Sequence, residues 1–191
     1  MGARAIIKFG GADLASGPKI REAAMKVLES NYDEIVVVVS AMKGMTDKLI
    51  RVISEIGDVD DQDYAEIVSM GERTSARLFC SALRSLGADA VYIEPDDEEW
   101  PIITTSDFKN ASPDIKKTCE RVKRFIEPLL GKKIVVICGF LGRDDKGRLT
   151  TLGRGGSDTT AMVLANCLNA DEVVLVKETE GVMSADPKII A

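Results

Sequence analysis

Short runs of β-branched residues alternate along this chain with longer segments of helical period, and this alternation constrains the fold most strongly. Two runs, 36–39 and 134–138, are apolar on both alternating faces. Strands of this kind are covered by helices on both sides, as in a parallel sheet. We therefore predict an α/β three-layer sandwich, with a mostly parallel central sheet, helices on both faces and these two strands in its middle. The predicted strands are 5–9, 34–40, 88–93, 133–139 and 172–177.

Between these strands, apolar residues recur every three or four positions, which predicts helices that each pack one stripe against the sheet. The stripes are Ile20, Ala23 and Val27; Met45, Leu49, Ile53 and Ile56; Met70, Leu78, Leu83 and Leu86; Ile115, Cys119, Val122, Ile126 and Leu129; and Ala161, Leu164 and Leu168. The polar stretch 94–113 is predicted to be a long surface connection with a short hairpin around Ile102 and Ile103. No second-domain boundary is visible, so residues 1–191 are predicted to form a single domain.

The 191 residues include no histidine, which removes whole reaction classes. The chain offers no Ser-His-Asp or Cys-His nucleophile pair and no His-containing zinc or haem site, and we predict no metal ligands. With 25 Lys and Arg against 31 Asp and Glu, it also lacks the basic excess that nucleic-acid binding needs. The chemistry must rest on carboxylates, lysine, arginine and backbone amides.

The four cysteines are far apart in the sequence and form no C-x-x-C pair, so we predict reduced core thiols. They are Cys80, Cys119, Cys138 and Cys167. The opening residues match neither a secretory signal nor a myristoylation motif, and no apolar run approaches the length of a membrane span. We therefore expect a cytoplasmic protein with no membrane partner.

The most informative segment is 150–160, TTLGRGGSDTT. Its glycines let the backbone approach a ligand, and the helix predicted to follow presents amides and a positive end to an anion. Ser157 is predicted to be the N-cap of that helix. Arg154 can offer a planar fork to a carboxylate or phosphate, and Asp158 is placed to bind an ammonium or orient a lysine. The alternative is an ordinary glycine turn with a capped helix and a solvated arginine.

Two further segments lie where predicted strands end. Lys8 is in the first strand, just before Gly10 and Gly11, and Ser40 closes the second, with Thr46 a few residues on. Ligands of parallel sheets bind beyond the carboxyl ends of the strands, so we expect these groups in one crevice. The alternative for the lysine is a place on an edge strand. The glycines spell neither a P-loop nor the dinucleotide-binding fingerprint.

Together these segments resemble the amino-acid kinase family, and most closely its aspartokinase branch. The matching stretches follow the family's order and are 8–11 (KFGG), 38–47 (VVSAMKGMTD), 70–73 (MGER), 102–111 (IITTSDFKNA), 139–142 (GF-x-G), 150–161 (TTLGRGGSDTTA) and 177–188 (KETEGVMSADPK). The GRGGSD block is the most specific of these.

The resemblance implies transfer of the γ-phosphoryl group of ATP to the side-chain carboxylate of L-aspartate, the first step toward lysine, threonine and methionine. By motif it implies catalytic roles for Lys8 and Asp158, with Mg²⁺ carried by the nucleotide phosphates. The implied substrate-binding residues are Ser40, Thr46, Glu72, Arg154, Gly155 and Ser157, and the implied nucleotide-binding residues are Gly10, Gly11, Lys177, Glu178, Met183 and Lys188. It also implies a homodimer or larger homo-oligomer.

The residue chemistry agrees with a carboxylate acceptor. A carboxylate with a pKa of about 3.9 is already ionised at pH 7, so it needs no histidine to remove a proton. Phosphoryl transfer requires positioning and cations on the phosphate oxygens, which lysine, arginine and glycine amides supply. This interpretation requires Lys8 and Arg154 to converge on one crevice.

Two departures from the family pattern stand out. Ala12 and Asp13 replace a usual Thr-Ser pair, and the sequence ends where the family's kinase domain continues and, in aspartokinases, ACT regulatory domains follow. We expect the C-terminal part of the domain to be missing, no ACT domain, and little or no kinase activity from 1–191 alone. The alternatives are a kinase for another small acid or phosphate, such as acetylglutamate or a nucleoside monophosphate, and a non-catalytic metabolite-binding or assembly module.

Overall fold

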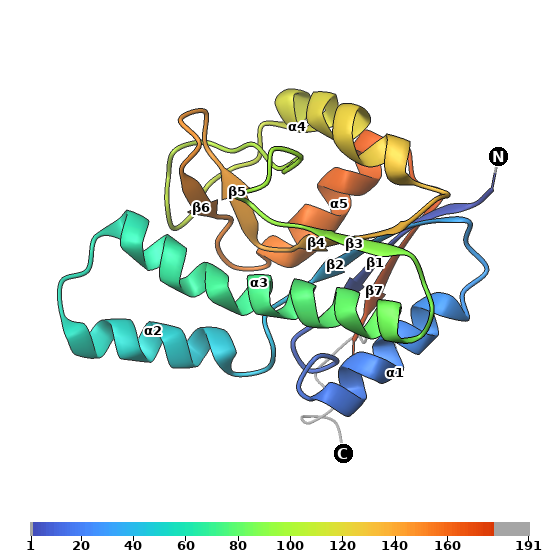
Figure 1. Cartoon of the computed structure of the whole chain (residues 1–191). Helices are drawn as coiled ribbons and strands as arrows, with labels where there is room; N and C mark the ends of the chain where they lie inside the picture. The colour runs from blue at the N-terminus through green and yellow to red at the C-terminus, as the bar shows by residue number, and fades with distance from the viewer. Residues whose placement is uncertain (1, 178–191) are drawn as a thin grey trace, which may run out of the picture.

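The computed structural model describes residues 2–177, whose strands and helices follow the predicted order except for two short strands, 141–143 and 149–151, that were not predicted (Figure 1). The strands are β1 (Arg4–Phe9), β2 (Glu34–Val39), β3 (Ala90–Ile93), β4 (Ile134–Cys138), β5 (Leu141–Arg143), β6 (Leu149–Thr151) and β7 (Glu172–Val176). The helices are α1 (Gly17–Leu28), α2 (Met45–Ile56), α3 (Asp61–Ser85), α4 (Ile115–Arg121) and α5 (Gly156–Leu168), and α4 runs on into a π-helical turn (Val122–Ile126) and a 3₁₀ turn (Glu127–Leu129).

Five strands form a parallel sheet in the order β3-β4-β2-β1-β7. One face is covered by α1 and α3 and the other by α4 and α5 (Figure 1). The predicted three-layer α/β fold is therefore confirmed. The two strands predicted for the middle, β2 and β4, are neighbours there, and residues 36–39 and 135–138 are fully buried. Because β1 lies between β2 and β7, Lys8 is not on an edge strand.

The predicted helix stripes are correct for α1 and α5. The stripes of α1 and α5 are buried throughout. In α2, however, Ile53 is buried while Ile56 is 69% exposed, because α2 packs on α3 and not on the sheet. The expectation that the α2 stripe contacts the sheet was wrong.

The predicted stripe of α3 is also partly wrong. Met70 and Leu78 are exposed, and the buried face carries small, aromatic and charged side chains. This face includes Ala65, Val68, Glu72, Arg73, Ala76, Phe79 and Leu83. A helix that contacts α1, α2 and the sheet at once needs small residues for close approach, so its buried face does not follow its largest apolar residues. In α4, Ile115 is likewise exposed.

The stretch 94–113 is less exposed than predicted, and it forms no hairpin around Ile102 and Ile103. Trp100 and Ile102 are fully buried. Ile103 and Thr104 make only single bridges, to Arg143 and Pro113 respectively. The hairpin of this region is instead the antiparallel pair β5–β6, against which the connection packs.

A disulfide joins Cys119 to Cys167, with their Cα atoms 4.7 Å apart, so the prediction of reduced thiols was wrong for this pair. Packing of α4 on α5 brings together two cysteines that lie 48 residues apart in the chain. Cys80 and Cys138 are free and buried. None of the helices within 2–177 has the length and apolar character needed to cross a bilayer.

Candidate functional site

A cleft of about 320 Å³ opens at the carboxyl ends of the central strands. It is lined by Lys8, Ser40, Ala41, Thr46, Glu72, Phe140, Gly153, Arg154, Gly155, Gly156, Ser157 and Asp158. These residues come from β1, from the loops after β2 and β4, from α2 and α3, and from the turn before α5 and the first turn of that helix. The structure thus brings Lys8 and Arg154 into one crevice, together with all the other predicted catalytic and substrate-binding positions.

Lys8 and Asp158 form an ion pair inside this cleft, with 2.8 Å between Nζ and Oδ1. Lys8 is 8% exposed, since its strand lies within the sheet, whereas Asp158 is on the first turn of α5 and reaches the open side. The pair holds the ammonium at the mouth of the sheet, where it can meet an anion.

The turn before α5 takes its shape from glycine. Gly153 and Gly155 have φ values of 71° and 76°, in the left-handed region that favours glycine. Gly155 is the N-cap and α5 begins at Gly156, so the prediction that Ser157 caps the helix was wrong. Ser157 lies one residue inside the first turn, because the left-handed glycine ends the turn without a side-chain cap. The N-terminus of α5 borders the cleft, where its amides favour an anion.

Glu72 lies on the opposite wall, on the buried face of α3, and is 4% exposed. Its Oε1 accepts a hydrogen bond of 3.1 Å from the backbone N–H of Ala41. Its Oε2 is buried with no hydrogen-bond partner among the described residues. Burial raises the pKa of Glu72 to about 7, although the Ala41 hydrogen bond opposes this shift. A buried carboxylate with a free oxygen is suited to an ammonium ligand.

The loop after β2 fits closely between neighbouring segments, and Ala41 is its central residue. A Cβ at Gly11 would lie 2.7 Å from the Ala41 carbonyl oxygen, and a Cβ at Gly71 would lie 2.7 Å from the Ala41 Cβ. Gly10 and Gly11 therefore lie beside the cleft and do not line it. The Gly10 N–H donates to Asp13, one of the two residues that replace the expected Thr-Ser pair.

The predicted nucleotide-binding residues are mostly not placed. Lys177 is exposed just beyond β7 and does not line the cleft. Glu178, Met183 and Lys188 lie outside the described residues. Within 2–177 no group of three or more His, Cys, Asp or Glu side chains is arranged to hold a metal ion.

Sequence reasoning missed two contributors to the cleft, Ala41 and Phe140. Phe140 has φ of 68°, unusual for a residue with a side chain, and its N–H donates to Thr160 on α5. Phe140 lies within the GF-x-G stretch, which the sequence identifies as a family match without assigning Phe140 a role in the cleft. Ala41 contributes its backbone N–H, which donates to Glu72. The identity of a side chain gives no indication of such a backbone contact.

Comparisons with known proteins agree with this geometry. The family model described as the amino acid kinase family matches residues 3–191. The aspartate kinase Ask_LysC of Stutzerimonas stutzeri is 37% identical over 187 residues, covering 96% of this chain and 44% of the relative. An aspartokinase of Helicobacter pylori is 38% identical over 185 residues, covering 95% and 44%. The chain therefore spans less than half the length of these curated relatives.

Solved structures give the same picture. E. coli aspartokinase III in complex with aspartate and ADP superposes with a TM-score of 0.87 at 28% identity, over 97% of this chain and 52% of that one. Isopentenyl phosphate kinase superposes with a TM-score of 0.62 at 15% identity, over 97% and 77% respectively, which indicates a shared fold only.

Proposed function

Because this chain belongs to the amino acid kinase family, we propose that it is part of an aspartate kinase. The whole protein would transfer the γ-phosphoryl group of ATP to the side-chain carboxylate of L-aspartate. The named relatives are aspartate kinases at 37% and 38% identity, which supports this substrate over others of the family. One observation carries the proposal: Glu72, Arg154 and Lys8 line the same cleft, and one oxygen of the buried Glu72 carboxylate has no hydrogen-bond partner among the described residues.

Each charge of an α-amino acid finds an opposite charge in this cleft. The ammonium of aspartate fits the free Oε2 of Glu72, and its α-carboxylate fits the exposed guanidinium of Arg154. Ser40, Thr46, Gly155 and Ser157 line the space between them. The side-chain carboxylate is then left for the region of Lys8 and the N-terminus of α5. Two charged anchors would hold this carboxylate, already ionised, in line with a phosphoryl donor.

The phosphoryl group would meet positive charge supplied by this chain. Lys8 Nζ is held by Asp158 at 2.8 Å, and the α5 N-terminus lies beside it. A preorganised ammonium stabilises charge on the transferring phosphoryl oxygens. Mg²⁺ bound to ATP would supply further charge neutralisation there.

Nucleotide contacts are proposed for Gly10 and Gly11 and for the segment containing Lys177, Glu178, Met183 and Lys188. Residues 1–191 are proposed to belong to one kinase domain, in a cytoplasmic homo-oligomer.

The test is an ADP-release assay on the whole protein with ATP, Mg²⁺ and a panel of acceptors. We expect turnover with L-aspartate and an acyl phosphate that hydroxylamine traps. L-Glutamate, acetylglutamate and a nucleoside monophosphate are the comparison acceptors. Preferred turnover of any of these would reassign the substrate, and ligand binding without ADP release would favour the non-catalytic alternative.

A further inference from the structure

The position of Glu72 depends on how α3 is seated against the rest of the molecule. Its carboxylate reaches the cleft from the helix, and one hydrogen bond, from Ala41, holds it there. Gly71 sets how near α3 approaches, because a Cβ at this position would meet the Ala41 Cβ at 2.7 Å. The buried face of α3 packs on α1, α2 and the sheet, and this packing sets the general orientation of the helix. A polar contact beside Glu72 can hold the rotation of the helix at this point more tightly.

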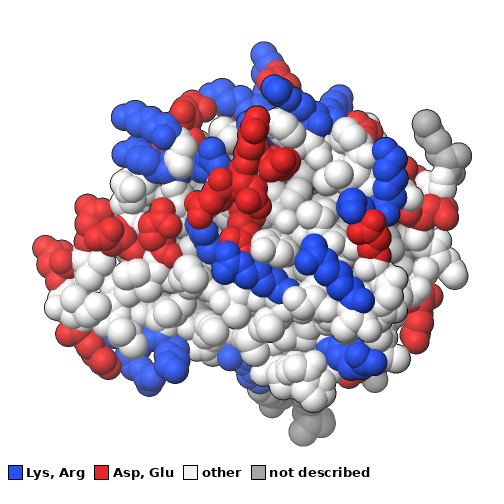
Figure 2. Space-filling view, viewed as in Figure 1, with Lys and Arg blue, Asp and Glu red and all other residues white. Residues whose placement is uncertain are grey.

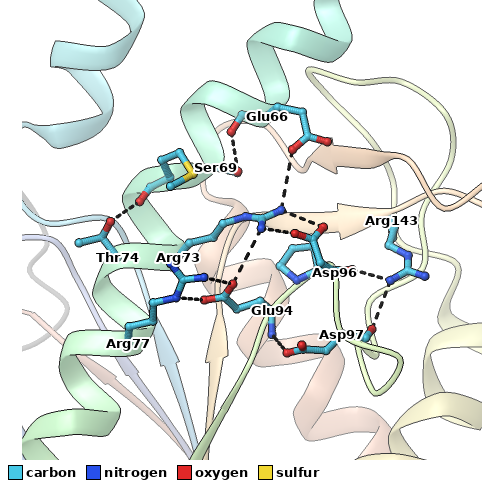
Figure 3. Close-up of polar contacts among 11 residues, drawn as sticks. Glu66, Ser69, Arg73, Thr74, Arg77, Glu94, Asp96, Asp97 and Arg143 are labelled. Carbon is cyan, nitrogen blue, oxygen red and sulfur yellow. Dashed lines mark hydrogen bonds and ion pairs between the residues drawn. The ribbon is translucent and has the colours of Figure 1, made fainter.

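Arg73, the next residue on α3, makes such a contact (Figure 3). Its guanidinium binds both oxygens of Asp96, at 2.5 and 3.2 Å. It also lies 3.8 Å from Glu94 and from Glu66. Figure 2 shows acidic and basic side chains gathered side by side where α3 meets this region. A planar guanidinium that binds both oxygens of a carboxylate fixes direction as well as distance.

Burial of the Arg73 side chain costs hydration free energy, although its partner Asp96 is 73% exposed. The Arg73 side chain is only 8% exposed, and its Nε has no hydrogen-bond partner among the described residues. A buried charge loses hydration, and an apolar residue of similar volume often stabilises a protein as well or better. Stability alone therefore does not explain an arginine at this position.

The loop 95–97, whose Asp96 binds Arg73, is also bound to the opposite wall of the cleft. Arg143, in β5, donates to the carbonyl oxygens of Pro95 and Asp97, at 2.5 and 3.2 Å. Strand β5 pairs with β6, which leads directly into the turn that carries Arg154. One continuous set of contacts thus runs from the helix of Glu72 to the turn of Arg154.

We propose that Arg73 is a positioning residue for the amino-acid substrate: its grip on Asp96 fixes α3 so that Glu72 stays opposite Arg154 across the cleft. This inference rests on the proposed function. Arg73 touches no substrate, and it acts through the two groups that would bind the ammonium and the α-carboxylate. Its loss should weaken aspartate binding and leave the nucleotide unaffected.

The test uses the whole protein with Arg73→Met, Arg73→Lys and Asp96→Asn, and measures KM for aspartate and for ATP, kcat and Tm. Loss of the charged fork in Arg73→Met should raise the aspartate KM by about tenfold or more, and the ATP KM should stay within about twofold. Arg73→Lys keeps the charge without the fork, and Asp96→Asn leaves Glu94 and Glu66 in place, so both should have intermediate effects. The double variant Arg73→Met/Asp96→Asn should be no worse than Arg73→Met. Lys117→Met, which breaks an exposed pair with Asp145, is the control and should change neither KM.

Two results would overturn the inference: equal increases in the two KM values, or a lower Tm with the aspartate KM unchanged in every variant. If Arg73→Met fails to fold, Arg73→Lys and Asp96→Asn decide by the same criterion. The wild-type protein distinguishes the two levels of proposal. Absence of aspartate-dependent ADP release in the wild type refutes the proposed function, whereas normal wild-type turnover with unaffected variants refutes only the role of Arg73.

Discussion

The two walls of the cleft hold their charges in opposite ways. On the turn before α5, Arg154 is exposed and the glycine backbone sets the shape. On α3, Glu72 is buried and held by Ala41. An exposed charge adds little to the cost of folding, while a buried and half-unpaired charge is costly until a ligand meets it. Substitutions on the first wall should therefore change binding alone, and those on the second should change binding and stability together.

The largest effect is expected at Lys8, where the two walls meet. Lys8→Ala removes a positive charge needed most in the transition state, so kcat of the whole protein should fall by at least roughly 100-fold. Steady-state ADP release with aspartate measures this. Lys133→Ala, which breaks an exposed pair with Asp89 at the other end of the sheet, is the matched control. A kcat for Lys8→Ala close to that of the control would contradict the proposed role.

The exposed wall is tested with Arg154→Ala. Loss of a charge-assisted contact to the α-carboxylate should raise the aspartate KM by roughly 10- to 100-fold. The Tm should not change, because Arg154 is exposed. Arg21→Ala on α1, also at an exposed arginine, serves as the control. A clear drop in Tm for Arg154→Ala would break the contrast between the walls.

The buried wall is tested with Glu72→Gln, for which binding and stability should move in opposite directions. The aspartate KM should rise by about tenfold or more, since the ammonium loses its counter-charge. The Tm above pH 7 should also rise. The folded-state pKa of about 7 exceeds the ordinary value of 4.5, so the folded protein keeps this proton longer, and stability falls as pH rises from 4.5 toward 7. The glutamine removes that loss.

Thermal unfolding at about pH 8 measures the stability effect, with the exposed Glu55→Gln on α2 as the matched control. If Glu72→Gln instead lowered the Tm, the unpaired carboxylate would be stabilising the fold, and the contrast between the walls would have to be withdrawn.

The pH dependence of binding sharpens the same comparison. Under the proposed function, ionised Glu72 is the form that would bind the substrate ammonium, and its pKa of about 7 puts the transition near neutrality. The kcat/KM for aspartate should therefore increase about tenfold per pH unit below about 7 and level off above it. A pH–rate profile measures this, and Glu72→Gln should remove the slope. A slope that persists in that variant would assign the titration to another group.

The smallest effect is expected at Gly71. Gly71→Ala places a methyl group 2.7 Å from the Ala41 Cβ and should move α3 away from the loop after β2. We expect a loss of about 1–3 kcal/mol of stability and a severalfold higher aspartate KM. Gly17→Ala, at the first residue of α1 with no atom within 4 Å of the new Cβ, is the control. Equal Tm values for the two variants would show that the contact yields without strain.

The sequence predicts the part of the fold that local pattern encodes. Runs with two apolar faces locate β2 and β4, because a strand covered by helices on both sides is apolar at nearly every position. The turn around Arg154 and the end of β1 were predictable for a related reason: glycines that permit close approach, next to charged residues, are visible in the sequence.

Pattern fails on α3 and on its surroundings. Hydrophobicity predicts a buried Met70 and an exposed Arg73, and the structure shows the reverse. Small residues on α3 take the buried positions because they allow close packing. Arg73 can be buried because carboxylates of a loop distant in the sequence neutralise its charge. Cys119 and Cys167 looked like separate thiols for the same reason, since only the packing of α4 on α5 makes them neighbours.

The sequence by itself thus determined the order of the helices and of the strands in the parallel sheet and, through the missing histidine and the glycine turn, the kind of chemistry available. Only the tertiary structure decided which face of α3 is buried, that Ala41 meets Glu72, and that Arg73 meets Asp96. The physical reason is that these contacts join segments 23 or more residues apart. The periodicity of a helix or strand shows which of its residues are buried. It carries no information about which residues of other segments they contact.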